Sequence, residues 1–391
     1  MNNILIKYIA FPSASLEVYN RGEEIIKKTF PEYNFIKSEN NPELIFILSG
    51  GSENQAKEIV HNLSSVLLIA MNENNSYAAA TEIKAYCNQN NIKSLLINID
   101  IEKKISKKIG FYFRFYKAIN NLKKYRIGLI GNVSKWLIAS NMQSEVLKSK
   151  FGIELIQYDW KNLKKYSDFE ANSNFINHFK NSIGFDITDS SKVYNLLANI
   201  IEENKLDAIT VECFPMVWEH SVTACLALSK LNTDNIPSGC EGDLTSISGM
   251  IIGKELTGKI PWMANLITLN LNKNSVFLAH CTIGTNMVSD YNITTHFETN
   301  TGNAVQGKFL GDEVTIFRFD KNLEKAFISY GKVIDRPDKN DACRTQIEVE
   351  LTENAIESLK HNPLGNHHLV LAGKHTDILS FFCKMTMIEI I

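Results

Sequence analysis

Three short stretches of this 391-residue chain carry side chains that could do chemistry together. Glu241 and Asp243 stand just before a predicted helix, His280 ends an apolar run, and the pair His367 and His368 precedes another apolar run. Carboxylates and separated histidines form a mixed oxygen and nitrogen donor set for a divalent metal such as Mn²⁺, with Mg²⁺, Co²⁺ and Zn²⁺ as competitors. The competing interpretation is structural, because acidic residues at a helix start commonly serve as caps and lone histidines often pack in cores.

Composition limits the classes of function. The chain is 44% hydrophobic and 21% charged, with a formal net charge of -2. These values exclude a disordered or fibrous protein and leave no excess of positive charge for nucleic acid. The N-terminus lacks the pattern of a signal peptide, and no apolar run approaches the ~20 residues of a membrane helix. We therefore expect a soluble, cytoplasmic protein with neither nucleic acid nor membrane as partner.

Cysteine spacing argues against two further classes. Seven cysteines are scattered along the chain without a CxxC pair. This distribution favours neither a disulfide scaffold nor a structural zinc site. It predicts that most of the cysteines are buried and behave as small hydrophobic residues.

Apolar runs and amphipathic stretches alternate through the first two thirds of the chain, as in parallel α/β units. The pattern begins with the buried run 43–49, restarts at 126–131 after a polar segment, and places a helix through 136–148. Ligands of such doubly wound sheets bind beyond the carboxyl ends of the strands. The glycine turns do not complete GxGxxG, so they do not indicate a dinucleotide site.

After Pro237 the pattern changes to successive strand-like runs with short turns, which predicts antiparallel sheet. Strands are expected at 275–279, 292–297, 313–319, 325–334, 346–351 and 368–372. The predicted fold class is α/β: two doubly wound parallel-sheet domains followed by a mainly antiparallel β domain with helices. The predicted domains are 1–122, 123–236 and 237–391, the last carrying the metal site.

Several motifs occur in an order that resembles the C-terminal domain of the L-fucose isomerase and L-arabinose isomerase superfamily. They are CEGDLTSISGMIIGKELTG (240–258), KIPWMAN (259–265), VFLAHCT (276–282), THFETNTG (295–302), GDEVTIFR (311–318), CRT (343–345) and NHHLVLAG (366–373). Upstream, the stretches LSGGSE, NSYAAATE, RIGLIG and VECFP look like the two N-terminal α/β domains of short fucose-isomerase-like proteins. The resemblance covers nearly the whole chain.

The resemblance implies a chemistry. In that family a divalent metal, usually Mn²⁺, holds adjacent oxygens of an open-chain aldose, and two acidic residues move protons through a cis-enediol. Glu241 matches the first acid, which binds metal and transfers protons. His280 looks like a metal ligand or a substrate-contacting histidine. One of His367 and His368, with His368 favoured, resembles the C-terminal metal histidine. Family members also form oligomers, so we expect a homo-oligomer.

The second acid of the family is the position that does not match, because a gapless alignment places Asn265 there. An amide oxygen can ligate a hard cation, but Asn cannot accept a proton at neutral pH. Asn265 is therefore predicted as a metal ligand at a catalytic position. Three alternatives remain open: one carboxylate suffices, Asp243 or Asp290 substitutes, or catalysis is lost.

The remaining predictions concern the substrate and the type of protein. The resemblance assigns Asp243, His367 and Arg344 to substrate binding. The leading hypothesis is a metal-dependent isomerase acting on a monosaccharide, and the alternative is a non-catalytic sugar- or metabolite-binding relative. Different carbon-skeleton chemistry through a similar enediolate is a third interpretation.

Overall fold

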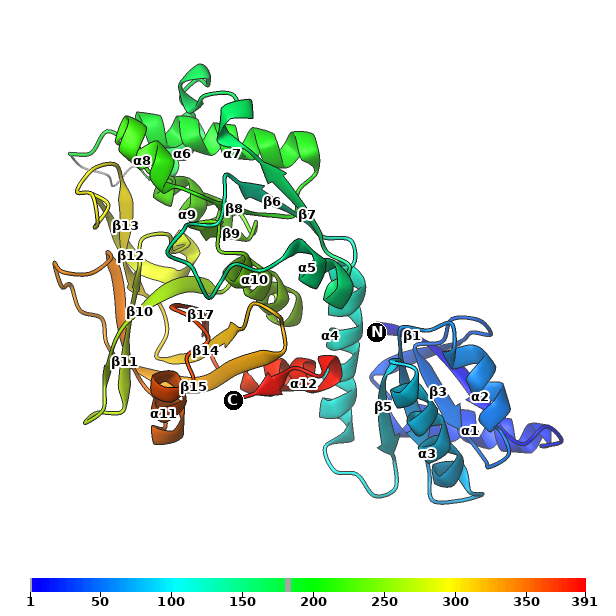
Figure 1. Cartoon of the computed structure of the whole chain (residues 1–391). Helices are drawn as coiled ribbons and strands as arrows, with labels where there is room; N and C mark the ends of the chain where they lie inside the picture. Colours follow the sequence, from blue (N-terminus) through cyan, green and yellow to red (C-terminus); the bar gives the residue numbers. More distant parts are fainter. Residues whose placement is uncertain (1, 180–183) are drawn as a thin grey trace. The chain divides into compact units, whose positions relative to one another are not determined.

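The computed structural model describes residues 2–179 and 184–391, and it confirms the predicted fold class of two parallel sheets followed by a mainly antiparallel one (Figure 1). The chain forms two compact units, residues 1–116 and 117–391. The predicted domain boundaries near 122 and 236 stay predictions. Within the described residues, no helix combines the length and hydrophobicity that crossing a bilayer requires.

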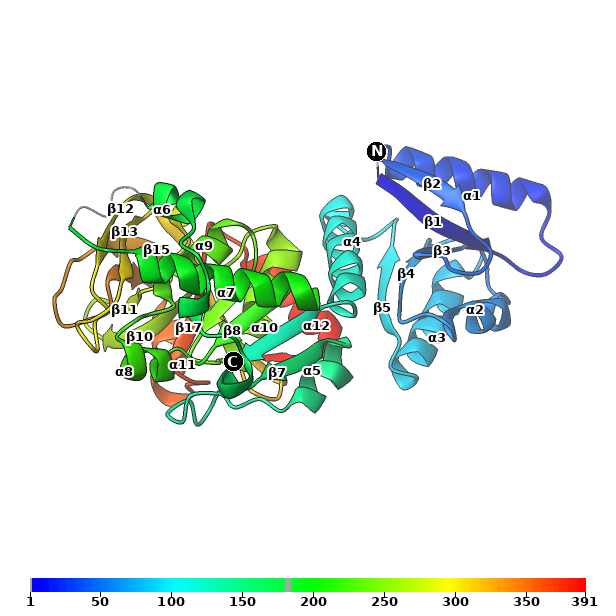
Figure 2. The same ribbon diagram turned by 90° about the horizontal axis from the view of Figure 1, so that it is seen from above.

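Unit 1 (residues 1–116) is a doubly wound domain around a five-stranded parallel sheet in the order β2-β1-β3-β4-β5. Its strands are β1 (Asn2–Ile9), β2 (Tyr33–Lys37), β3 (Leu44–Ile47), β4 (Ser65–Ala70) and β5 (Lys93–Asn98). Its helices are α1 (Leu16–Thr29), α2 (Glu53–Val60) and α3 (Ser76–Gln89), while α4 (Ile105–Leu122) runs on into the second unit. Figure 2 shows α1 on one face of the sheet and α2 and α3 on the other. Every residue of β3 and β4 is buried, as the continuous apolar runs of a covered parallel sheet require.

Unit 2 (residues 117–391) contains a second parallel sheet in the order β7-β6-β8-β9. Its strands are β6 (Arg126–Ile130), β7 (Glu154–Tyr158), β8 (Ala208–Val211) and β9 (Ser238–Cys240). The helices of this part are α5 (Ser144–Phe151), α6 (Ser173–His178), α7 (Thr188–Asn204), α8 (Phe214–His220), α9 (Cys225–Thr233) and α10 (Leu244–Thr257). The last strand, β9, follows the boundary predicted near 236, and it leads directly into the first acidic motif.

The helix predicted through residues 136–148 is wrong in its first half, because α5 begins only at Ser144. Residues 132–143 form turns that close over the end of β9, and the backbone N–H of Ser134 donates to the carbonyl of Glu241 at 2.9 Å. Long-range contacts of this loop therefore override its local helical spacing.

The rest of unit 2 is a mainly antiparallel sheet in the order β14-β17-β10-β11-β16-β15-β18. Its strands are β10 (Trp262–Asn270), β11 (Ser275–His280), β14 (Glu313–Phe319), β15 (Lys325–Asp335), β16 (Thr345–Glu350), β17 (His367–Ala372) and β18 (Glu389–Ile390). Because β14 pairs with both β17 and β15, six strands close into a barrel. A separate hairpin, β12 (Val288–Thr294) and β13 (Ala304–Phe309), and helices α11 (Glu353–His361) and α12 (Thr376–Thr386) complete the unit.

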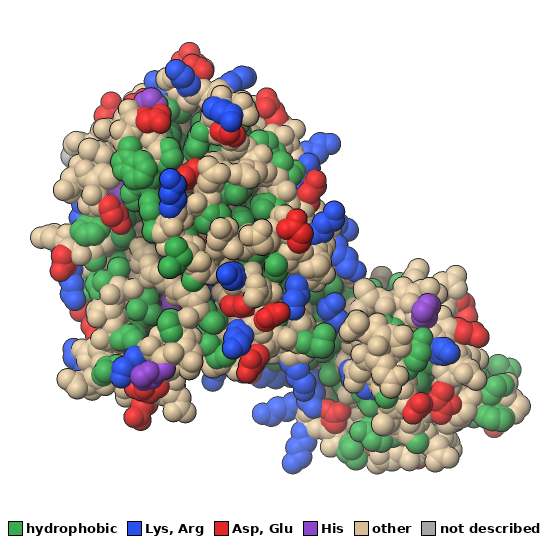
Figure 3. All heavy atoms as spheres, in the orientation of Figure 1, with side chains coloured by type: hydrophobic (Ala, Val, Ile, Leu, Met, Phe, Trp, Pro, Cys, Tyr) green, Lys and Arg blue, Asp and Glu red, His purple; other side chains and the backbone are tan. Residues whose placement is uncertain are grey.

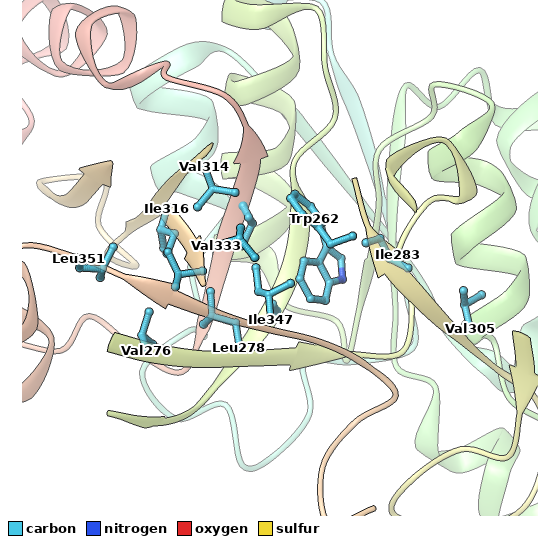
Figure 4. Packing of buried hydrophobic residues seen from close by; sticks show 14 of the residues in the cluster. Trp262, Val276, Leu278, Ile283, Val305, Val314, Ile316, Val333, Ile347 and Leu351 are labelled. Atoms are coloured by element: carbon cyan, nitrogen blue, oxygen red, sulfur yellow. The ribbon is translucent and has the colours of Figure 1, made fainter. Parts of the chain in front are cut away.

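Apolar side chains fill this barrel. Figure 4 shows Val276 and Leu278 of β11 beside Ile347 of β16, and all three are buried. Alternation along each strand sends every second residue into the core and the others to the opposite face. This alternation decides which polar residues of β10 and β17 can reach the neighbouring parallel sheet.

All seven cysteines are buried and none forms a disulfide bond. The scattered spacing predicted this outcome.

Candidate active site

The candidate site lies in unit 2, where the carboxyl end of β9 meets the end of β11, the start of β17 and the interior of β10. Glu241 directly follows β9 with φ +60°, and Gly242 has φ +67°. These two left-handed residues turn the chain abruptly from β9 into α10. A Cβ at Gly242 would collide with the backbone carbonyl of Asn132, so glycine is required there. Left-handed backbone at a non-glycine residue costs roughly 1–2 kcal/mol, and such strain is concentrated at functional sites.

Asp243 caps α10 and also holds a histidine. Its side chain accepts from the backbone N–H of Ser246 at 2.9 Å and from Nδ1 of His367 at 2.8 Å. Burial raises the pKa of Asp243, but the hydrogen bond from His367 and the charge of Arg318 lower it by more, so the net shift is downward. Asp243 is therefore an ionised residue that caps α10 and holds His367. Substrate binding by Asp243 stays a prediction.

Arg318 lies fully buried beneath this pair and was not found from the sequence. Its guanidinium donates to the carbonyl of His367 and to Oγ of Ser140, the latter at 2.6 Å. A Cβ at Gly365 would strike the guanidinium, which explains the glycine there. The positive charge of Arg318 compensates the buried carboxylate of Asp243.

His367 presents one ring nitrogen to Glu241. Nδ1 is engaged by Asp243, so Nε2 is the ring nitrogen left to face Glu241. Nε2 is buried and has no hydrogen-bond partner among the residues that the structure describes, and it lies 4.0 Å from Oε2 of Glu241. A buried ring nitrogen that faces a carboxylate across this distance calls for a proton or a cation between the two groups. This is the feature of the site that most strongly indicates a ligand.

His368 does not join this group. Its ring packs edge-on against Phe327 at 5.8 Å, and its Nδ1 contacts the carbonyl of Asn366 at 2.8 Å. Adjacent residues of a strand point to opposite faces, so His368 enters the barrel while His367 faces Asp243. Burial lowers the pKa of His368 to about 3, which keeps the ring neutral. The structure thus brings His367 to Glu241, in the place where the sequence favoured His368.

His280 lies beside His367, with ring centroids 5.6 Å apart at 72°. Its Nδ1 contacts Oγ1 of Thr282 at 2.9 Å. Burial, followed by the neighbouring charge of His367, lowers the pKa of His280 to about 3. His280 is therefore a neutral imidazole next to the cluster, as a ligand or a hydrogen-bonding residue would need to be.

Asn265 is paired with His367 across β10 and β17. Its Oδ1 accepts from Nδ2 of Asn366 at 2.7 Å, and its Nδ2 lies 3.8 Å from Sγ of Cys343. This register places Asn265 beside His367, and its role as a metal ligand stays a prediction. The amide oxygen, however, already accepts a hydrogen bond within the protein.

The loop between β12 and β13 adds a carboxylate that sequence reasoning missed. Oε2 of Glu298 lies 2.9 Å from Nε2 of His296, and its Oε1 lies 3.5 Å from Sγ of Cys343. Burial raises the pKa of Glu298, but the hydrogen bond and charge of His296 lower it by more, to about 2. Burial lowers the pKa of His296, but the bond to Glu298 and nearby thiols raise it above its usual value. The signal in the sequence was a His-x-Glu spacing inside THFETNTG.

Aromatic residues border Glu241. The indole N–H of Trp136 donates to Oε2 of Glu241 at 2.6 Å, and the Trp136 ring lies 4.8 Å from that of Phe214. Trp136 is 48% exposed and Trp218, which also contacts Phe214, is 67% exposed. Figure 3 shows hydrophobic side chains exposed over the region of α8, the helix that carries Phe214 and Trp218. Exposed indole rings beside a carboxylate are suited to the apolar face of a sugar.

Arg344, predicted to bind substrate, holds the loop that carries Glu298. Its Nε donates to the carbonyl of Thr295 at 2.8 Å, and its guanidinium lies over the ring of Phe297 at 5.7 Å. These contacts position the loop; substrate binding by Arg344 stays a prediction.

The donor set fits a divalent cation only in part. Glu241 and the free nitrogen of His367 are spaced to share one, since metal–oxygen and metal–nitrogen bonds are about 2.0–2.2 Å long. Among the described residues, however, no group of three or more His, Cys, Asp or Glu side chains is placed to hold a metal. Two protein donors therefore fit, and further donors would have to come from an amide, water or substrate.

The fold and site together define an α/β protein whose carboxylate–histidine cluster lies between a parallel sheet and a barrel. The chain is similar to the sulfoquinovose isomerase of Priestia aryabhattai, with 27% identity over 296 residues, 71% of this chain and 65% of that protein. It is also similar to the sulfoquinovose isomerases of Alkalicoccus urumqiensis, 21% identical over 303 residues (73% of this chain, 68% of that protein), and Clostridium sp. (strain MSTE9), 21% over 313 residues (74% and 69%). The Priestia match thus spans under two thirds of that relative's length. No protein-family model matches the chain.

Proposed function

We propose that this protein is an aldose–ketose isomerase that acts on a monosaccharide through an enediol. The observation that carries the proposal is the carboxylate of Glu241 facing the unpartnered Nε2 of His367 at 4.0 Å. The similarity to proteins named sulfoquinovose isomerase supports it independently.

Glu241 is the group we assign to proton transfer at carbon. A positioned carboxylate can remove the proton next to a carbonyl and return it to the neighbouring carbon. The indole N–H of Trp136 fixes one carboxylate oxygen and leaves the other available. The strained backbone at Glu241 aims the side chain away from α10 and into the cluster.

We further propose that Glu241 and His367 hold a divalent metal, most simply Mn²⁺, with His280 and the amide of Asn265 close by. A bound metal of this kind polarises a carbonyl and stabilises the negative charge of an enediolate. Asp243 keeps the His367 ring in the tautomer that leaves Nε2 free, as carboxylates behind metal-bound histidines commonly do. In this proposal the metal-binding histidine is His367, not His368 as the sequence favoured.

Sulfoquinovose, the sugar in the relatives' names, is the first substrate to test, together with neutral aldoses and ketoses. The decisive experiment is deuterium exchange from solvent into each sugar, combined with metal analysis of the purified protein. Carbon–hydrogen exchange reports enediol formation even where the product is not known. Exchange that is absent for every sugar, with and without added Mn²⁺, would contradict the proposal.

A non-catalytic sugar-binding protein is the second candidate, and the amide at Asn265 is the observation that favours it. Sugar binding detected by calorimetry without any exchange would support this candidate. A homo-oligomeric state stays a prediction under both.

Replacing Asn265 with Asp is a direct test of the metal assignment. The substitution adds a negative charge opposite His367 at nearly unchanged volume, so we expect Mn²⁺ affinity to rise about 10-fold or more. Calorimetric titration with Mn²⁺ alone measures this effect. Asn270→Asp, at the far end of the same strand, is the matched control and should leave the affinity unchanged. Equal affinities of Asn265→Asp and wild type would place residue 265 outside the metal's reach.

A further inference from the structure

The proposed isomerisation needs a second group that carries a proton, and the structure limits which residue can serve. Asp243 is fully buried, and its two oxygens are engaged by His367 and Ser246. Asp290 is exposed on β12, and its side chain accepts from the adjacent backbone N–H of Tyr291. Asp243 and Asp290, the two substitutes that the sequence suggests, are therefore unsuited to carry the second proton.

Glu298 is better placed, and two separate chains of contacts connect it to the site. The first runs through sulfur: Oε1 of Glu298 lies 3.5 Å from Sγ of Cys343, which lies 3.8 Å from Nδ2 of Asn265. Sγ of Cys343 thus lies between Glu298 and Asn265, the position at which the resemblance led us to expect an acidic residue. The loop carrying Glu298 therefore reaches the part of β10 that pairs with His367.

The second chain of contacts runs through aromatic rings. His296, the partner of Glu298, packs against Phe214 at 5.7 Å, and Phe214 packs against Trp136 at 4.8 Å. Trp136 in turn donates to Glu241. A continuous series of ring and polar contacts therefore links Glu241 to Glu298.

Exposure agrees with this placement. The side chain of Glu298 is 39% exposed, whereas that of His296 is 8% exposed. The ring of His296 has a second contact, from Nδ1 to Oγ1 of Thr299 at 3.1 Å, which fixes its orientation. Glu298 is consequently fixed on its buried side and open toward solvent, as a group that meets a substrate must be.

We propose that Glu298, together with His296, is the second proton carrier of this site and replaces the acid that Asn265 lacks. The inference rests on the proposed isomerase function. The pair starts with one proton shared between Nε2 of His296 and Oε2 of Glu298, and Glu241 starts ionised.

The proton balance of the reaction closes with these two groups. Glu241 takes the proton from carbon 2, the freed electron pair forms the double bond between carbons 1 and 2, and the carbonyl oxygen receives the proton of the pair. In the second half the pair removes the proton of the hydroxyl on carbon 2, which becomes the ketone. The double-bond electrons then take the proton of Glu241 onto carbon 1. Both groups end in their starting states.

The test compares Glu298→Gln with Asp290→Asn, an exposed carboxylate on the strand just before the same loop. We expect Glu298→Gln to lower kcat by ~10²–10⁴-fold, the usual range for an acid–base group, with little change in KM. Asp290→Asn should retain wild-type kcat. Glu298→Asp keeps the charge and should recover part of the rate, which a merely structural role of the side chain would not predict.

Two further readouts separate the possible failures. The pH profile of kcat should lose one limb in Glu298→Gln and keep both in Asp290→Asn. One outcome would overturn this inference and leave the isomerase function standing: Glu241→Gln is inactive, but the kcat of Glu298→Gln is within about threefold of that of wild type. No exchange by wild type on any sugar would overturn both.

Discussion

The two parallel sheets of this protein share a topology but differ in what they present at their carboxyl ends. In each sheet the first strand along the chain lies between the second and the third, and the fourth lies next to the third. Met71 follows the fourth strand in unit 1, and Glu241 follows the fourth strand in unit 2. Both residues precede a helix. Equivalent topological places thus carry a buried apolar residue in one unit and a carboxylate in the other.

The polar groups at the unit 1 edge bond to one another. The backbone N–H of Asn72 donates to Asp100 at 2.7 Å, and Nδ2 of Asn98 donates to Oδ1 of Asn72 at 2.9 Å. Oγ of Ser76 accepts from the backbone N–H of Met71 at 3.0 Å. At the unit 2 edge, by contrast, Nε2 of His367 is buried without a partner and faces Glu241.

The difference shows that a doubly wound sheet provides a place for a ligand but not the site itself. His367 and Asn265 come from β17 and β10, strands of the barrel. A second element with its own polar residues must therefore meet the sheet edge before chemistry becomes possible. The following predictions test whether activity belongs to the unit 2 edge alone.

The largest effect is expected at Glu241. Glu241→Gln keeps the hydrogen bond from Trp136 but removes the proton acceptor, so exchange should fall ~10²–10⁴-fold or more. Isotope exchange followed by NMR measures the rate, and circular dichroism checks the fold. The exposed Glu219→Gln on α8 serves as control and should remain active. Wild-type exchange in Glu241→Gln would remove Glu241 from the reaction.

A large loss of stability is expected for Asp243→Asn. The amide can still cap α10, but the buried charge of Arg318 loses its compensating carboxylate, which typically costs about 3–5 kcal/mol. Urea denaturation at pH 7 gives the free energy of unfolding. Asp189→Asn, whose exposed carboxylate pairs with Lys192, should cost under about 1 kcal/mol. Similar costs for both variants would argue against the buried charge pair.

A smaller, pH-dependent effect is expected at His368. Its pKa is about 3 in the folded protein, below the ordinary value of 6.5, so only the unfolded chain takes up its proton between these values. The resulting stability is complete above pH 6.5 and is lost as the pH falls toward 3, by up to about 1.4 kcal/mol per pH unit. Urea denaturation from pH 7 to pH 4 should show a shallower slope for His368→Leu than for wild type.

The control for that slope is His361→Leu, which removes an exposed histidine of α11. Its slope should match that of wild type. A His368→Leu slope equal to that of wild type would show that burial does not keep this ring neutral.

The smallest effect is expected in unit 1. Asp100→Asn leaves an oxygen that accepts from the backbone of Asn72, so we expect a cost of about 1 kcal/mol or less in stability and exchange within twofold of wild type. The same exchange assay as for Glu241→Gln measures it. A tenfold loss of exchange would show that the unit 1 edge also serves the reaction.

Local patterns in the sequence were sufficient for much of the fold. The strands predicted at 313–319 and 325–334 agree with β14 and β15 to within one residue. Both segments have strong hydrophobic periodicity, which depends only on neighbouring residues. The strand expected at 292–297 is wrong at its end. It runs from Val288 to Thr294, because residues 295–297 belong to a loop held by Arg344 and His296.

Sequence by itself predicted Glu241, Asp243 and a histidine of the 367–368 pair as candidate site residues, because their types and their positions at element ends are local properties. It also determined that only one of the two histidines could face that chemistry. Tertiary structure decided that the histidine is His367, since the barrel buries His368 against Phe327. It alone brought Glu298 within one sulfur atom of Asn265, because pairing of distant strands and loops depends on packing across the whole unit.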